Sequence, residues 1–221
     1  MDQKDITKAI QQARENSKKR KFAQSFDLIF SLRQLDLKKE TDKVNNFIIL
    51  PFSIGKKMSI TALVGPELST KAKEFCANVI PVEHFKITEK KKIKKLSQET
   101  DFFIAQANIM PQVAAAFGKI LGPRGKMPNI KAGCVVPPTA DLKQVIEKLH
   151  KTVRVETKNE PTLKLRVGIE SMKDEEIIEN IHAVYNAVIH MLPQEKDNIK
   201  RVILKLTMGK PVVIGAQEQP K

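Results

Sequence analysis

The stretch between residues 58 and 150 alternates short apolar runs with amphipathic segments, and this alternation limits the fold more than any other feature of the chain. Runs of strand length lie at 58–64, 79–82 and 101–105, and segments with helical spacing lie at 67–78, 88–97, 111–121 and 139–150. We expect Thr139 to be the N-cap of the last helix. Because strands that alternate with helices need crossover connections, the pattern predicts a Rossmann-like α/β domain with a mainly parallel, doubly wound sheet.

Both ends of the chain lack this alternation. A helical pattern, three strand patterns and a long amphipathic helix precede a last strand, at 5–14, 25–32, 46–50, 163–169, 174–192 and 199–206. A further strand at 152–156 is expected to pair with 163–169 as an antiparallel hairpin. Two organisations are therefore nested. We predict a discontinuous, two-layer α+β domain from residues 1–52 and 151–221, with the α/β domain inserted at 53–150.

The charge of the chain points to an anionic partner. Its 221 residues include 39 Lys and Arg against 25 Asp and Glu, a formal net charge of +14, and 41% hydrophobic residues allow packed cores. Neutralisation of nucleic-acid phosphates is the favoured explanation, while an anionic membrane surface and a merely basic surface are the alternatives. Trp is absent and there is one Tyr, so stacking of single-stranded bases is disfavoured and structured RNA is preferred.

The motifs of catalysis and of cofactor binding are missing. No dinucleotide-binding or phosphate-binding glycine loop occurs, and the four histidines are scattered. Cys76 and Cys134 stand alone, as reduced cysteines of a cytosolic protein do. We therefore expect no enzyme, no cofactor and no metal site, with a nucleotide-binding enzyme as a weaker alternative. The polar N-terminus and the lack of a long apolar run predict no signal peptide and no membrane partner.

The segment LGPRGKMPN at residues 121–129 is the most specific motif in the sequence. Its glycines and prolines fix a rigid loop that can bring main-chain N–H groups and two cations close to phosphates. Its candidate residues are Gly122, Arg124, Gly125 and Lys126. The alternatives are an ordinary connector with solvated cations and the GXXG clamp of a KH domain. Pro123 and the sequence VVPP at 135–138 argue against the clamp.

A second motif, TMG, follows the last predicted strand. Thr207 offers a hydroxyl, Met208 an adaptable apolar contact, and Gly209 permits close approach of the backbone. Two lysine-rich runs complete the candidates. Residues 18–21 fit RNA binding or a nuclear-localisation signal, and the six lysines within 86–95 fit either a solvated helix face or contact with transfer RNA or neighbouring RNA.

LGPRGKMPN followed by TMG resembles the ribosomal protein L-one family, whose members build the mobile side stalk of the large ribosomal subunit. The match extends over nearly the whole chain, and the strand at 25–32 looks more like archaeal or eukaryotic members than bacterial ones. Ile130 stands where many members carry Pro, which leaves the glycines and basic residues of the loop intact.

The resemblance implies a two-domain molecule with a hinge, in which the discontinuous domain is the main RNA-binding domain. Carried over by position, the RNA-binding residues are Lys21, Phe22, Ser25, Asp27, Arg166, Thr207, Met208 and Gly209. Arg166 stands where bacterial relatives often have His. The implied partners are large-subunit ribosomal RNA, exit-site transfer RNA and the protein's own messenger RNA, whose translation it would repress. We expect a cytoplasmic protein on the large subunit that is monomeric when free. A free-standing RNA-binding regulator or chaperone is the alternative.

Overall fold

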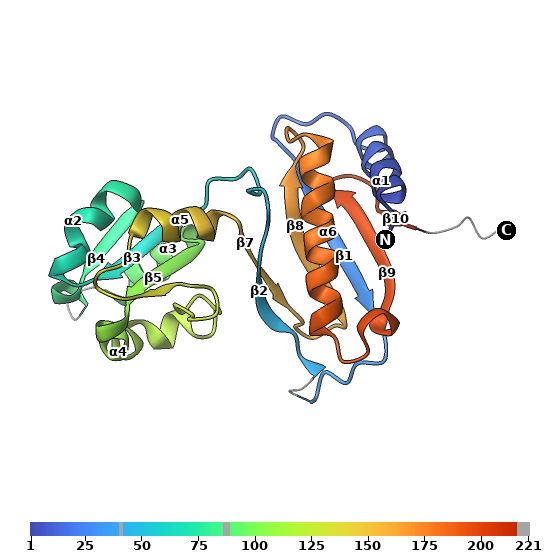
Figure 1. The fold of residues 1–221 in the computed structure, drawn as a ribbon. Helices are drawn as coiled ribbons and strands as arrows, with labels where there is room; N and C mark the ends of the chain where they lie inside the picture. Colours follow the sequence, from blue (N-terminus) through green and yellow to red (C-terminus); the bar gives the residue numbers. More distant parts are fainter. Residues whose placement is uncertain (40–41, 86–88, 216–221) are drawn as a thin grey trace. The chain divides into compact units, whose positions relative to one another are not determined.

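A computed structural model of the chain describes residues 1–39, 42–85 and 89–215. The chain divides into two compact units, one formed by residues 1–56 with those from 151 onward and the other by residues 57–150 (Figure 1). The first division lies four residues beyond the predicted junction at 52/53. One unit holds an antiparallel sheet and the other a parallel sheet, so the predicted fold class is confirmed.

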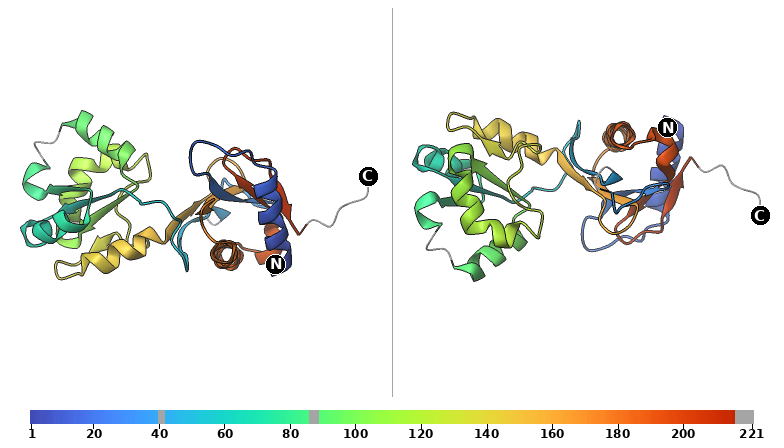
Figure 2. Two further views of the ribbon diagram at one scale, coloured as in Figure 1. Left: turned by 90° about the horizontal axis from the view of Figure 1, so that it is seen from above. Right: turned by 90° about the horizontal axis from the view of Figure 1, so that it is seen from below.

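The first unit is built on a four-stranded antiparallel sheet in the order β10-β9-β1-β8. Its strands are β1 (Ser25–Leu32), β8 (Thr162–Ile169), β9 (Ile199–Leu206) and β10 (Val212–Ile214). Alternate residues of β1, namely Phe26, Leu28 and Phe30, are fully buried. The helices α1 (Gln3–Glu15) and α6 (Asp174–Met191) cover this buried face together (Figure 2). The unit therefore has two layers, and the other face of β1 is half-buried.

The two helices are fixed to each other by one arginine. The guanidinium of Arg14 donates to Asp174 Oδ1 at 2.7 Å and to the carbonyl of Glu170 at 2.7 Å, and it lies over the ring of Phe26. These contacts join the end of α1 to the start of α6 and to the buried face of β1. They also set the point from which the segment 16–24 leaves α1.

The connections between the units form a separate two-stranded ribbon. β2 (Asn45–Ile49) pairs antiparallel with β7 (Thr152–Glu156), and β8 pairs with β1. The predicted hairpin between 152–156 and 163–169 is therefore wrong. β2 leads into the second unit and β7 returns from it, so the two segments run side by side in opposite directions and each satisfies the other's hydrogen bonds.

The second unit is a parallel sheet in the order β4-β3-β5-β6. Its strands are β3 (Ile60–Val64), β4 (Asn78–Pro81), β5 (Phe102–Gln106) and β6 (Val135–Val136), and its helices are α2 (Pro66–Phe75), α3 (Lys90–Glu99), α4 (Met110–Leu121) and α5 (Leu142–His150). α2 packs against α5 and α3 against α4, on opposite sides of the sheet (Figure 2). Short 3₁₀ turns lie at Val82–His84, Ala107–Ile109 and, in the first unit, Glu195–Asn198.

Some helix ends differ from the sequence-based expectation. α5 begins at Leu142, and the carboxylate of Asp141 accepts the N–H of Lys143 at 3.0 Å. Asp141 therefore caps this helix, and the prediction of Thr139 is wrong, since Asp141 is the polar side chain next to the first helical residue. Thr88, expected to begin the lysine-rich helix, lies outside the described residues, and α3 begins at Lys90.

The loop at residues 122–129 holds the end of α3. Lys126 Nζ donates to the carbonyls of Ser97 at 2.9 Å and Thr100 at 2.6 Å. Arg124 donates to the carbonyl of Lys94 at 3.1 Å and also contacts the Ser97 hydroxyl. The Ser97 carbonyl is among the last four of α3, which lack partners within the helix, whereas the Lys94 carbonyl lies further in and also accepts from the Ser97 hydroxyl. Cations are favoured at this end of the helix by its dipole. Both cations of the loop therefore fasten α3 within the second unit.

We predict that Lys126→Met lowers the free energy of unfolding of this unit by about 1–3 kcal/mol, because it removes charge-assisted hydrogen bonds and leaves two carbonyls without their donor. Urea denaturation followed by circular dichroism measures the change. Lys131→Met, at an exposed lysine two residues beyond the loop, is the control and should change stability little. Equal loss in the two variants would show that Lys126 does not fasten the helix.

Candidate nucleic-acid interface

The start of β1 and the end of β9 lie side by side, because the two strands pair antiparallel with Phe26 opposite Leu206. The pairing continues one step beyond the strand end. The N–H of Thr207 donates to the carbonyl of Ser25 at 3.1 Å, and the Thr207 hydroxyl accepts the N–H of Ser25 at 3.1 Å. The same hydroxyl lies 3.3 Å from the Ser25 carbonyl. The Thr207 hydroxyl, expected to serve a partner molecule, thus closes the end of the ladder.

A fully buried amide, Gln24, joins the loops that follow these strand ends. Its Nε2 donates to the Ser17 hydroxyl at 2.9 Å and to the Lys18 carbonyl at 3.3 Å. Its Oε1 accepts the N–H of Met208 at 3.2 Å. One side chain therefore holds the basic segment before β1 and the TMG turn after β9 together.

Gln24 was not among the candidates from sequence. A signal was present, since period-2 alternation places residue 24 in phase with the buried Phe26 and Leu28. A polar residue on the buried side of a strand needs hydrogen-bond partners, because burial of an unpaired polar group is unfavourable. An amide that can both donate and accept at such a position indicates a role in linking neighbouring segments.

A hollow of about 440 Å³ lies beside this junction. It is lined by Phe22, Ala23, Ser25, Gly55, Lys56, Arg166, Ile169 and Thr207. We call it the strand-end groove. All of its lining residues belong to the first unit. Four of the residues carried over from the resemblance line it, and they come from three separate segments of the chain.

Gly55 forms part of the groove and was also missed from sequence. Its φ is +78°, and a Cβ atom there would lie 2.6 Å from Cγ1 of Ile169. Any other residue would be strained and would push against Ile169. The connector PFSIGKK therefore does more than join two domains: its glycine lets the chain pass close to β8, and Lys56 then adds an ammonium group to the groove.

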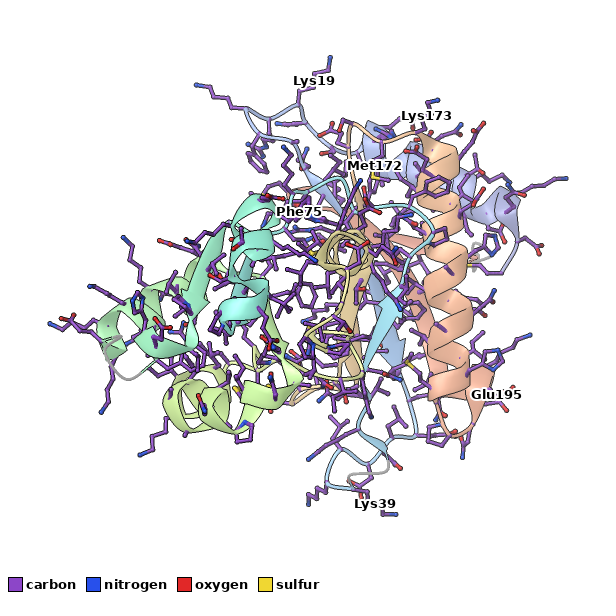
Figure 3. The ribbon with its side chains drawn as sticks, turned by 60° about the vertical axis from the view of Figure 1, so that its left-hand side comes forward. Lys19, Lys39, Phe75, Met172, Lys173 and Glu195 are labelled. Carbon is purple, nitrogen blue, oxygen red and sulfur yellow. The ribbon has the colours of Figure 1, made fainter. Side chains whose placement is uncertain are left out.

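Lys21, Met208 and Gly209 adjoin the groove along the chain without lining it. Met208 is 60% exposed and Phe22, which does line the groove, is 53% exposed, so both large apolar side chains face solvent. Gly209 turns the chain by donating its N–H to the Leu206 carbonyl at 2.9 Å. Lys21 is exposed on the segment before β1, and Lys19 of the same segment extends outward (Figure 3).

Asp27 lies one step along β1 from the groove, opposite Arg166 on β8 and Lys205 on β9. Burial raises the pKa of Asp27, while the charges of Arg166 and Lys205 act in the opposite direction. The carboxylate sits between two cations, which places hydrogen-bond acceptors beside groups that attract phosphate. This surface can hold a backbone phosphate and an amino or hydroxyl donor at the same time.

The other predicted residues, Gly122, Arg124, Gly125 and Lys126, do not line this groove and belong to the second unit, where the two cations hold α3. Among the described residues no group of three or more His, Cys, Asp and Glu is placed to hold a metal ion. None of the helices within the described ranges combines the length and apolar character that crossing a bilayer requires.

Comparison with known proteins identifies the family. Residues 12–210 match the ribosomal protein L1p/L10e family. The chain is 44% identical to large ribosomal subunit protein uL1 of Nanoarchaeum equitans, over 92% of this chain and 96% of that protein. It is 37% identical to the protein of the same name from Methanocaldococcus jannaschii, over the whole length of both. The resemblance stated from the two motifs is confirmed, and the chain belongs to the ribosomal protein L1p/L10e family.

Proposed function

We propose that this chain is a structural protein of the large ribosomal subunit that binds ribosomal RNA through the strand-end groove. The observation that carries the proposal is the convergence of Phe22, Ser25, Arg166 and Thr207 on one hollow, although they come from three distant segments. The relatives bear the name of a large-subunit ribosomal protein, which supports the same assignment.

The chemistry of the groove suits a folded RNA. Lys56 and Arg166 supply charge for phosphates, and the neighbouring Lys21 extends that surface. Phe22 and Met208 lose exposed apolar area when a ribose or a base face covers them. Asp27 offers acceptors for a base amino group or a 2′-hydroxyl, which distinguishes RNA from DNA.

Three finer parts of the proposal rest on membership of the family. The protein forms the mobile side stalk of the subunit in the cytoplasm, assists release of exit-site transfer RNA, and represses translation of its own messenger RNA. The last activity needs only a messenger segment that presents the same fold as the ribosomal site, because the groove recognises shape and backbone as well as charge.

We predict that the protein binds a folded large-subunit ribosomal RNA fragment more tightly than random-sequence duplex RNA, by about 10³-fold or more at 200 mM salt. A purely phosphate-based contact loses about 10³-fold or more between 50 and 200 mM salt. Hydrogen bonds and apolar contacts in the groove are screened little, so the ribosomal fragment should show the shallower salt dependence. Equal slopes and equal affinities for the two RNAs would contradict specific binding.

We predict that Gln24→Met weakens binding of this fragment by tenfold or more, because the loops that carry Lys21 and Met208 lose their shared clamp. Asn198→Leu is a matched control: Asn198 is an equally buried amide that holds Arg33 O and the Gln194 N–H at the opposite end of β9. Each variant should lose about 1–3 kcal/mol of stability.

Both dissociation constants are measured at a temperature where circular dichroism shows both variants folded. Only Gln24→Met should also lose discrimination between the ribosomal fragment and random duplex. Similar losses of affinity in the two variants would mean that Gln24 acts through stability alone.

A further inference from the structure

The second unit carries a separate concentration of positive charge on α3. Five of its ten residues are lysines, and all five are exposed: Lys90, Lys91, Lys92, Lys94 and Lys95. We call this surface the lysine face. No ion pair involves these lysines within the described parts of the chain. Ile93 and Ser97, on the other side of the helix, are buried.

The lysine face opposes the stability of the helix that carries it. Lysines three and four residues apart, such as Lys91–Lys94 and Lys91–Lys95, repel each other along the helix surface. The N-cap residue is Glu89, whose side chain makes no capping hydrogen bond, and the first turn itself contains no acidic residue, although the helix dipole favours negative charge there. Arg124 and Lys126 fasten the other end of the helix. An anion against the lysine face would relieve this repulsion.

The nature of that anion follows from what the lysine face lacks. A helix that lies in a membrane surface needs exposed apolar side chains, and none of the exposed large hydrophobic residues is on α3. Protein interfaces are enriched in aromatic residues and Arg and depleted of Lys, whereas α3 has five Lys and neither aromatic residues nor Arg. A row of lysines without anchors matches the regularly spaced charges of a nucleic-acid backbone.

We propose that the lysine face of α3 is a second RNA-binding surface, which contacts the phosphates of double-stranded RNA without reading its sequence. Arg124 and Lys126 serve this surface by holding α3 in place, and they do not themselves contact the RNA. The proposal goes beyond the function of the strand-end groove, because it concerns the other unit and a different mode of recognition.

The test replaces Lys91, Lys94 and Lys95 together by Gln in the full chain. Gln has nearly the same helix propensity as Lys. The matched control replaces Lys71, Lys73 and Lys143 by Gln: these are exposed lysines on α2 and α5, on the other side of the sheet (Figure 2). Binding to a random-sequence RNA duplex of about 16 base pairs is measured between 50 and 200 mM salt.

The variant in the lysine face should bind the duplex about tenfold more weakly at 100 mM salt. Its slope of log affinity against log salt should fall by roughly 2–3, since each released phosphate contact contributes about 0.9. Its thermal midpoint should stay equal or rise, because like-charge repulsion is removed. The control should lose less than about threefold in affinity.

Equal losses in the two triple variants would overturn the proposal, since net charge alone would then explain binding. Preferential loss of binding to vesicles containing one part phosphatidylserine to two parts phosphatidylcholine, with duplex binding unchanged, would overturn it in favour of a membrane. The ribosomal fragment separates this proposal from the proposed function. If the wild-type chain fails to bind that fragment specifically, only the RNA-binding role of the strand-end groove is contradicted. The result with the random duplex would still test the lysine face.

Discussion

The pairing of β1 with β9 brings the two ends of the chain together, and the strand-end groove exists only because of that pairing. Phe26, Leu28, Leu204 and Leu206 of the paired strands are buried beneath α1 and α6, and this burial offsets the entropy of closing the long segment, residues 33–198, between β1 and β9. Loop-closure entropy grows slowly with length, so an inserted unit is tolerated between the paired strands. At the end of the ladder, the Thr207 hydroxyl and the Gln24 amide hold two loops in one geometry.

Such preorganisation matters for binding a folded RNA. A loop that must be ordered when the partner arrives loses conformational entropy, which weakens the complex. Gln24 fixes the main chain near Lys18 and Met208 beforehand, while the side chains of Phe22 and Met208 remain exposed to a partner. Under the two proposals the units have different roles: the first would recognise a particular RNA shape, and the second would attract phosphates through α3 without reading sequence.

Local pattern was enough to predict β1 and β9 with their observed bounds, because each has apolar residues at alternate positions and one buried face. It failed for β10 and β6, which have three and two residues and too few positions to show alternation. It also misassigned the partner of β7, since hairpins are the default for neighbouring strands, whereas here β2, across the inserted unit, satisfies β7.

The candidate site, like the fold, could be predicted from sequence only in part. Motif resemblance supplied the four predicted residues that line the groove, and periodicity could have supplied Gln24. Gly55 and Lys56 could not be found in this way, because they lie in a connector whose place beside Ile169 depends on tertiary structure. Arg124 and Lys126 show a second limit of sequence patterns. Their charge indicated phosphate binding, and in the structure both side chains also donate to carbonyls of α3 or of the residue that follows it, a use that no sequence pattern distinguishes from phosphate binding.

Amide hydrogen exchange in the presence and absence of the folded ribosomal RNA fragment tests the central claim most directly. RNA in the strand-end groove should slow exchange by about tenfold or more in peptides covering residues 21–25 and 206–210, because bound RNA suppresses the local opening that exposes these amides. Peptides from α2 and α5 should be unchanged. Slower exchange confined to the second unit, with the exchange of residues 206–210 unchanged, would contradict the assignment of the groove as the RNA-binding site.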